Sequence, residues 1–209
     1  MSSALSSLPL AEALSLTRTG DVWLFRGRSG PDRLIQNLTN APVNHVGMAL
    51  VLEDLPPLIW HAELGRGLPD VWTGQNQRGA QLHDLEAAVH QWHEKYGQRA
   101  WLRQLSPEVT RDQEDAALRT VARLDGTPFP TSTRVFARWF AGRVRRGRSE
   151  RDDAMETAYC AEIVATTYQA MGLLPDDVSP SWYDPGRFWS GDNLDLTHAR
   201  LGQEIAVIL

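Results

Sequence analysis

The chain has 209 residues, of which 42% are hydrophobic and 22% charged, so its composition excludes a disordered or fibrous protein and fits one globular domain. Its formal net charge of −5 argues against the chain-wide basic surface of a nucleic-acid-binding protein. Cys160 is the single cysteine, which excludes an internal disulfide and zinc sites with two or more cysteine ligands.

The first half of the chain predicts a short helix, a strand and a hairpin. The helix is expected around residues 9–16, and the strand at 21–25 follows a Gly-Asp turn signal. Residues 44–53 alternate large apolar side chains with small or polar ones, which indicates a strand with one core-facing side. A turn at 54–57 and an apolar run at 58–64 complete an antiparallel hairpin.

The second half predicts helices separated by short extended segments. The expected elements are a polar loop at 65–79, a helix at 82–96, a strand at 100–105, a helix at 107–124 capped by Ser106, a helix from Cys160 to Met171 that ends at Gly172, and a last strand at 205–209. Residues 131–148 carry six arginines and no acidic residue, which is the one marked charge asymmetry in the chain.

The termini and the hydropathy suggest a cytoplasmic protein. The first residues have neither the basic start nor the uninterrupted apolar stretch of a secretory signal. No apolar run reaches the ~18 to 20 residues that a membrane span needs. We expect one domain over residues 1–209, with a leader at 1–18 and a basic insertion at 130–155.

Cys160 is a candidate nucleophile because of its expected position at a helix start. With Thr157 as N-cap, the sulfur would lie near free backbone N–H groups and the positive end of the helix dipole, which favour the thiolate. The alternative is that Cys160 is a small buried apolar side chain, the usual role of a lone cysteine.

His45 and Glu63 are candidate partners of that thiol. His45 shares a strand face with Gly47 and Ala49, where a helix could lie close enough to bring a sulfur to the imidazole. An even hairpin register puts Glu63 on the same face, where it could accept the second ring N–H of His45. His61 shares that face and competes for this role, ~6.8 Å further along the strand. Structural roles for His45 and Glu63 are the alternatives.

These residues form an ordered set of motifs that resembles a known family. The motifs are GD-x-x-L-F-x-G at 20–27, NHVGM at 44–48, HAE at 61–63, GTPF at 126–129 and YCAEIV at 159–164. Their order, with the histidine strand before the cysteine helix, is similar to circularly permuted, NlpC-type papain-like cysteine hydrolases of the YiiX-like branch. The resemblance spans roughly residues 20 to 190.

The resemblance implies an α+β, circularly permuted papain-like fold, in which a small antiparallel sheet packs against the cysteine helix. It implies Cys160 as nucleophile, His45 as general base and acid, and Glu63 as the third catalytic residue. The reaction it implies is hydrolysis of an amide, ester or thioester through a thioester acyl-enzyme, without a cofactor.

The substrate is expected to be a peptide, a small molecule or an acyl group. Tyr159 precedes the nucleophile, as an aromatic residue does in the family. A helix at 131–146 would align Phe136 and Trp139 beside arginines, a pattern suited to an acyl chain or to peripheral contact with anionic lipid. The alternative is that this stripe packs against the domain. The sequence leaves the oligomeric state open.

Two other functions compete with catalysis. One is a non-catalytic binding module that keeps the papain-like groove. The other is a metal site built from His45, His61 and Cys160, which combine nitrogen and sulfur ligands on neighbouring elements.

Overall fold

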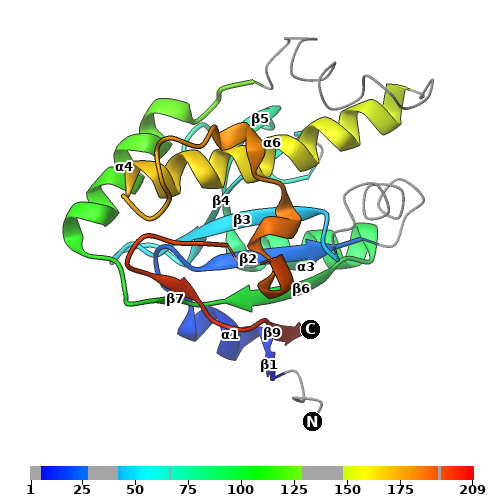
Figure 1. Ribbon diagram of the computed structural model, residues 1–209. Helices are drawn as coiled ribbons and strands as arrows, with labels where there is room; N and C mark the ends of the chain where they lie inside the picture. The colour runs from blue at the N-terminus through cyan, green and yellow to red at the C-terminus, as the bar shows by residue number, and fades with distance from the viewer. Residues whose placement is uncertain (1–5, 28–41, 66, 129–147, 193) are drawn as a thin grey trace.

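The computed structural model of the protein describes residues 6–27, 42–65, 67–128, 148–192 and 194–209 (Figure 1). A seven-stranded sheet runs in the order β1-β9-β6-β2-β3-β4-β5. Its strands are β1 (Ser7–Pro9), β2 (Val22–Arg26), β3 (His45–Leu50), β4 (Leu58–Glu63), β5 (Gly79–Asp84), β6 (Arg99–Arg103) and β9 (Ile205–Ile208). The helices are α1 (Leu10–Leu16), α3 (Leu85–Tyr96), α4 (Arg111–Leu124) and α6 (Arg148–Ala170).

Shorter elements complete the described chain. Strands β7 (Leu105–Ser106) and β8 (Arg200–Leu201) form a separate two-stranded sheet, and three 3-10 turns, η1 (Pro180–Trp182), η2 (Pro185–Phe188) and η3 (Ser190–Asp192), follow α6. None of the helices in the described ranges is long and apolar enough to cross a bilayer.

The α+β class is confirmed, but the sheet is larger than the predicted small antiparallel one. Strand β1 pairs with β9 in parallel, while the other pairings are antiparallel. The segment expected to be a leader supplies β1 and α1, and Leu10 and Ala13 of α1 are buried against the sheet. The predicted hairpin is confirmed as β3 and β4, with Met48 opposite Trp60.

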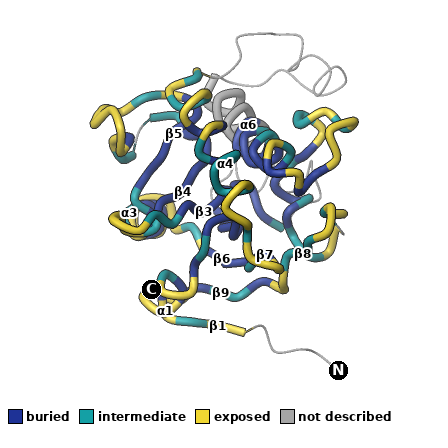
Figure 2. The backbone as a smooth tube through the Cα atoms, turned by 90° about the vertical axis from the view of Figure 1, so that its left-hand side faces the viewer, coloured by how far each residue is buried: buried dark blue, intermediate teal, exposed yellow. Residues whose placement is uncertain are grey.

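The sheet has two covered faces, which Figures 1 and 2 show from two directions. Helices α6 and α4 lie on one face, and α3 and α1 on the other. Alternation along the strands divides the core accordingly: Val46 and Met48 of β3 pack in the cluster that contains α6, whereas Ala49 packs in the cluster that contains α3. Below we call these the α6 core and the α3 core.

The helix predicted at 82–96 is confirmed as α3, but it begins at Leu85, and the helix predicted to start at 107 begins at Arg111. Strand β5 occupies residues 79–84 and pairs with β4, and Asp84 caps α3 by accepting a hydrogen bond from the backbone N–H of Ala87. Helix α4 begins only at Arg111, because Thr110 and Gln113 form a reciprocal capping box. In both cases a local capping side chain fixes where the helix starts.

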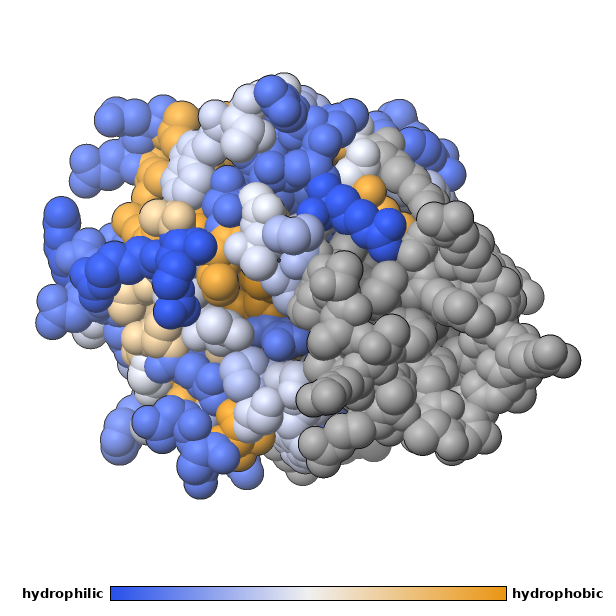
Figure 3. Space-filling view, turned by 90° about the horizontal axis from the view of Figure 1, so that it is seen from above, coloured by the Kyte–Doolittle hydropathy of each residue, from blue (hydrophilic) through white to orange (hydrophobic). Residues whose placement is uncertain are grey.

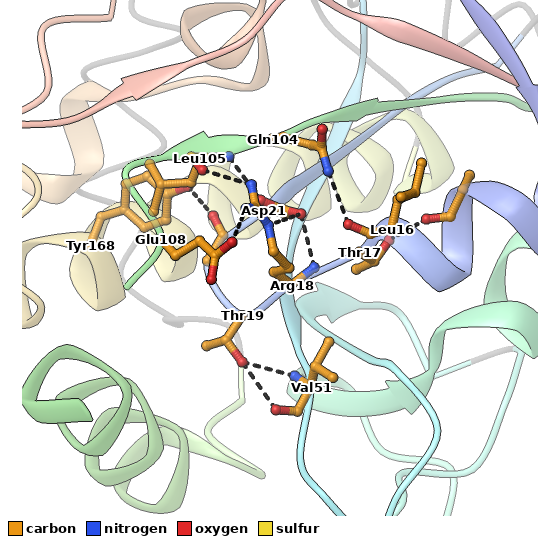
Figure 4. Close-up of polar contacts among 12 residues, drawn as sticks. Leu16, Thr17, Arg18, Thr19, Asp21, Val51, Gln104, Leu105, Glu108 and Tyr168 are labelled. Atoms are coloured by element: carbon orange, nitrogen blue, oxygen red, sulfur yellow. Dashed lines mark hydrogen bonds and ion pairs between the residues drawn. The ribbon is translucent and has the colours of Figure 1, made fainter. Parts of the chain in front are cut away.

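The Gly20-Asp21 pair, which precedes β2, is held by hydrogen bonds from neighbouring elements (Figure 4). The buried carboxylate of Asp21 accepts hydrogen bonds from the backbone N–H groups of Arg18, at 2.9 Å, and Leu105, at 2.8 Å. Tyr168 of α6 donates to the carbonyl of Gly20 at 2.5 Å. Burial raises the pKa of Asp21 to about 6, although the two backbone bonds and Arg18 act in the opposite direction. This network ties β2 to β7 and to α6.

Arg103 holds the C-terminal tail against β6. Its side chain is buried and donates hydrogen bonds to the carbonyl groups of Phe188, Leu201 and Gly202. Glu204 lies 3.6 Å from its Nε atom and supplies the compensating charge. The tail is therefore a packed part of the domain.

Candidate functional site

Strands β3, β4 and β5 place four titratable side chains on the sheet face that α3 covers. These are His45, His61, Glu63 and His83, and each is at most 4% exposed. Their strand neighbours Val46, Ala62 and Leu82 point the other way, into the α6 core. Adjacent strands thus bring together residues that are up to 38 positions apart in sequence.

The three imidazoles form a continuous line of contacts. Nε2 of His45 lies 3.1 Å from Nδ1 of His61, and Nε2 of His61 lies 3.0 Å from Nδ1 of His83. Each of these short nitrogen–nitrogen contacts needs one proton between the two rings, so the tautomers of the three residues are linked. Oε2 of Glu63 lies 3.6 Å from Nδ1 of His83.

An aromatic wall covers this line. Trp92 of α3 meets the His45 and His61 rings edge to face, with ring centroids 5.1 and 5.0 Å apart. Phe25 of β2 packs edge to face against Trp92 at 4.6 Å and contacts His45 at 5.9 Å. The rings exclude water and leave the imidazoles in a medium that disfavours charge.

Burial keeps the three histidines neutral at pH 7. It lowers the pKa of His45 to about 3 and that of His83 to about 4, and it holds the pKa of His61 well below its ordinary value. A positive charge on His83 also lowers the pKa values of His45 and His61. The charge of Asp70 acts in the opposite direction and raises the pKa of His83. Neutral imidazoles have a lone pair that can accept a proton or bind a metal ion.

Cys160 lies elsewhere. It is fully buried in the α6 core, together with Val46 and Trp60, while the His45 ring packs on the α3 side of the same strands. The sequence predicted that the cysteine helix would cover the Gly47 face of β3. In the structure, α3 covers that face. The structure does not bring the thiol and the imidazole together on one face.

The expected helix start at Thr157 is also wrong. Helix α6 begins at Arg148, roughly three turns before Cys160. In the interior of a helix, backbone N–H groups are used by the i−4 carbonyls, so Cys160 has neither the free donors nor the dipole end that the sequence interpretation invoked.

The contacts of Glu63 and His61 differ from the expected ones. Glu63 does share the face of His45, as the hairpin register predicted, but the ring contact of His45 is with His61. Glu63 lies instead beside His83, a residue that sequence analysis assigned to a helix. The alternation of Ala80 and Leu82 with Gln81 and His83 was the signal for β5, and the adjacent strong helical pattern masked it.

The remaining predicted residues are placed as follows. Tyr159 is 7% exposed in the α6 core, where burial raises its pKa to about 12. Phe136 and Trp139, with most of the arginine-rich segment, lie outside the described residues. The metal set of His45, His61 and Cys160 is not assembled, because Cys160 lies on the other face of the sheet.

Comparison with known proteins adds little to this geometry. No family model matches the chain. No curated protein sequence matches it either. Among solved structures, the chain is similar to the metalloprotein yiiX from Escherichia coli O157:H7, with 18% sequence identity, a TM-score of 0.48, and coverage of 91% of this chain and 88% of that chain. A similarity of this degree decides neither the family nor the activity.

Proposed function

We propose that the protein is a cysteine hydrolase of the permuted papain-like, NlpC type, with Cys160 as nucleophile and His45 as its base. The thiolate adds to the carbonyl carbon of an amide, ester or thioester, and His45 passes the thiol proton to the leaving group as the old bond breaks. Water, deprotonated by His45, then hydrolyses the thioester and releases the acid and the free thiol. The motif order is the sequence basis of this proposal.

The contact between His45 and His61 is the structural observation that supports it. A histidine base needs a partner on one ring nitrogen that fixes its tautomer and orientation. Nδ1 of His61, 3.1 Å from Nε2 of His45, can serve as that partner. This assigns Nδ1 of His45 to proton transfer, and it makes His61, not Glu63, the positioning residue.

The proposed reaction requires contact between the Cys160 sulfur and the His45 imidazole. Cys160 and His45 pack on opposite sides of β3, so sulfur and imidazole must meet around the start of that strand, where His45 is its first residue. Among the described residues seen in Figure 3, hydrophilic side chains predominate around a broken band of hydrophobic ones, and Cys160 is 0% exposed. Reactivity of the thiol is thus the decisive property.

Intact-mass spectrometry after mixing with p-nitrophenyl acetate and p-nitrophenyl laurate tests this function. We expect one acyl adduct on the wild-type chain that hydroxylamine removes, no adduct on Cys160→Ala, and slow formation on His45→Ala. Preference for laurate would support an acyl-chain substrate, as proposed from Phe136 and Trp139. Ester hydrolysis by Cys160→Ala at the wild-type rate, or a thiol that reacts like a free one with pKa near 8.5, would refute the proposal.

A further inference from the structure

The group formed by His61, Glu63 and His83 has a chemistry beyond the positioning role that the proposed hydrolysis gives to His61. One ligating atom from each residue lies within 4.8 Å of the other two, and all three side chains are buried. His61 and Glu63 share one face of β4, and His83 enters from β5, where it is opposite Ile59. Two neighbouring strands of a hydrogen-bonded sheet therefore hold the three groups in position.

The spacing of the ligating atoms suits a small tetrahedral ion. Zinc binds imidazole nitrogen and carboxylate oxygen at about 2.0 to 2.2 Å, so two ligands in a tetrahedral site lie about 3.4 Å apart. The observed separations are 3.0 Å between Nε2 of His61 and Nδ1 of His83, and 3.6 Å between Nδ1 of His83 and Oε2 of Glu63. These values bracket the required distance, and side-chain adjustments of a few tenths of an ångström would reach it.

The protonation states also fit a cation. Burial keeps His61 and His83 neutral, so each can offer a lone pair, and Glu63 can supply a negative charge that partly balances a divalent ion. His61 would bind through Nε2 and donate its Nδ1–H to Nε2 of His45. Metal-bound histidines generally donate their other ring N–H to an acceptor, which is most often a carboxylate, a carbonyl or water and would here be Nε2 of His45.

The loop after β4 leaves room beside the carboxylate. A Cβ atom built on Gly67 would lie 2.9 Å from Oε1 of Glu63, so a larger residue there would press on that oxygen. Glycine at this position lets the backbone approach Glu63 closely while the carboxylate keeps its orientation toward His83.

We propose that His61, Glu63 and His83 bind one divalent transition-metal ion, with Zn²⁺ as the preferred ion. Two imidazoles and one carboxylate match zinc and its neighbours in the first transition row, whereas Mg²⁺ and Ca²⁺ prefer sites made of oxygen ligands. His45 acts as the positioning residue that orients His61. The zinc site rests on its three ligands and not on the proposed hydrolysis, but the two share His61. With zinc bound, Nε2 of His45 accepts from His61 and Nδ1 of His45 carries the ring proton, so the zinc-loaded form differs from the form in which Nδ1 of His45 takes the thiol proton.

Zinc titration of the metal-free full-length chain against a chromophoric chelator tests this site. We expect one Zn²⁺ per chain, weakened at least about 100-fold in His83→Gln and Glu63→Gln, and about 10-fold in His45→Gln, the range for residues that orient a ligand. His90→Ala is the matched control, because His90 is exposed on α3, and it should bind as the wild type does.

A variant that keeps a ligand separates loss of binding from loss of folding. His83→Cys replaces one zinc ligand type with another and should retain binding, and a zinc-induced rise in melting temperature should accompany binding in each variant that retains it. Cys160→Ala should bind zinc normally while losing acylation, so the two proposals fail separately. Absence of stoichiometric binding, or equal affinity in wild type, His83→Gln and Glu63→Gln, would overturn the site.

Discussion

Trp60 of β4 donates a hydrogen bond from Nε1 to Oγ1 of Thr167 in α6, across 3.1 Å, inside a buried core. This bond crosses from the sheet to the helix and fixes the position of α6 along β4. Because Cys160 lies about two turns earlier in the same helix, the bond also sets the position of the Cys160 backbone along β4.

Thr167→Val should destabilise the protein by about 1 to 3 kcal/mol, because the shape is kept while the buried indole N–H loses its acceptor. Urea denaturation at neutral pH measures this. Thr166→Val is the control, since Oγ1 of Thr166 bonds only the carbonyl of Glu162 among the groups described, and its effect should be much smaller. Equal effects of the two changes would contradict the role given to the Trp60 bond.

His61→Phe should slow acylation of Cys160 by about 100-fold or more, whereas Glu63→Gln should change it far less. Phenylalanine keeps the ring against Trp92 but removes the nitrogen that orients His45. The pH profile of the acylation rate distinguishes this from a packing defect, because only loss of the orienting contact should shift it. A larger loss in Glu63→Gln would restore the original Cys-His-Glu assignment.

Asp21 should make stability depend on pH in a defined window. Its pKa is raised from 3.8 to about 6 in the folded state, so the folded protein holds this proton more tightly than the unfolded chain does. The resulting stabilisation, on the order of 3 kcal/mol, is complete below pH 3.8 and is lost as the pH rises through about 6.

Asp21→Asn should remove that contribution. The difference in unfolding free energy between wild type and variant, measured by urea denaturation from about pH 4 to about pH 7, should change in the direction that disfavours the wild type at higher pH. A difference that stays constant across this range would show that the Asp21 carboxyl titrates normally.

Gly79→Ala should cost about 3 kcal/mol or more. Gly79 has a φ of +126°, and a Cβ atom there would lie 2.1 Å from the carbonyl oxygen of Thr127. Gly74→Ala is the comparison: its φ is +66°, nothing lies within 4 Å, and only the conformational cost of about 1 to 2 kcal/mol applies. Thermal unfolding of both variants measures the difference in stability. Similar losses of stability would mean that the backbone at Thr127 can move away from a side chain at position 79.

The sequence predicted the hairpin and the faces of its strands well, because alternation is a local property. Val46 and Met48 do face one core, and Glu63 does share the face of His45. It could not show which helix covers which face. The Gly47 side was expected to receive the cysteine helix, but the side chain of Ile59 fills the space at Gly47 and Trp92 of α3 covers the neighbouring histidines.

Helix starts were predicted less well for a related reason. Thr157 and Ser106 are both plausible caps in isolation, yet α6 extends back to Arg148 and the capping box at Thr110 takes the start of α4. His83 was missed because its strand is short and runs directly into α3. Competing local signals and tertiary packing decided these cases.

The order of strands has a consequence for synthesis on the ribosome. Strand β1 is made first among the described strands, but its neighbour in the sheet is β9, which is made last, and β9 also borders β6. Strand β1 therefore emerges long before β9 has been synthesised. Until then, the backbone N–H and C=O groups of β1 lack the partners that they have in the folded sheet. Completion of this sheet therefore has to follow the emergence of β9 from the ribosome.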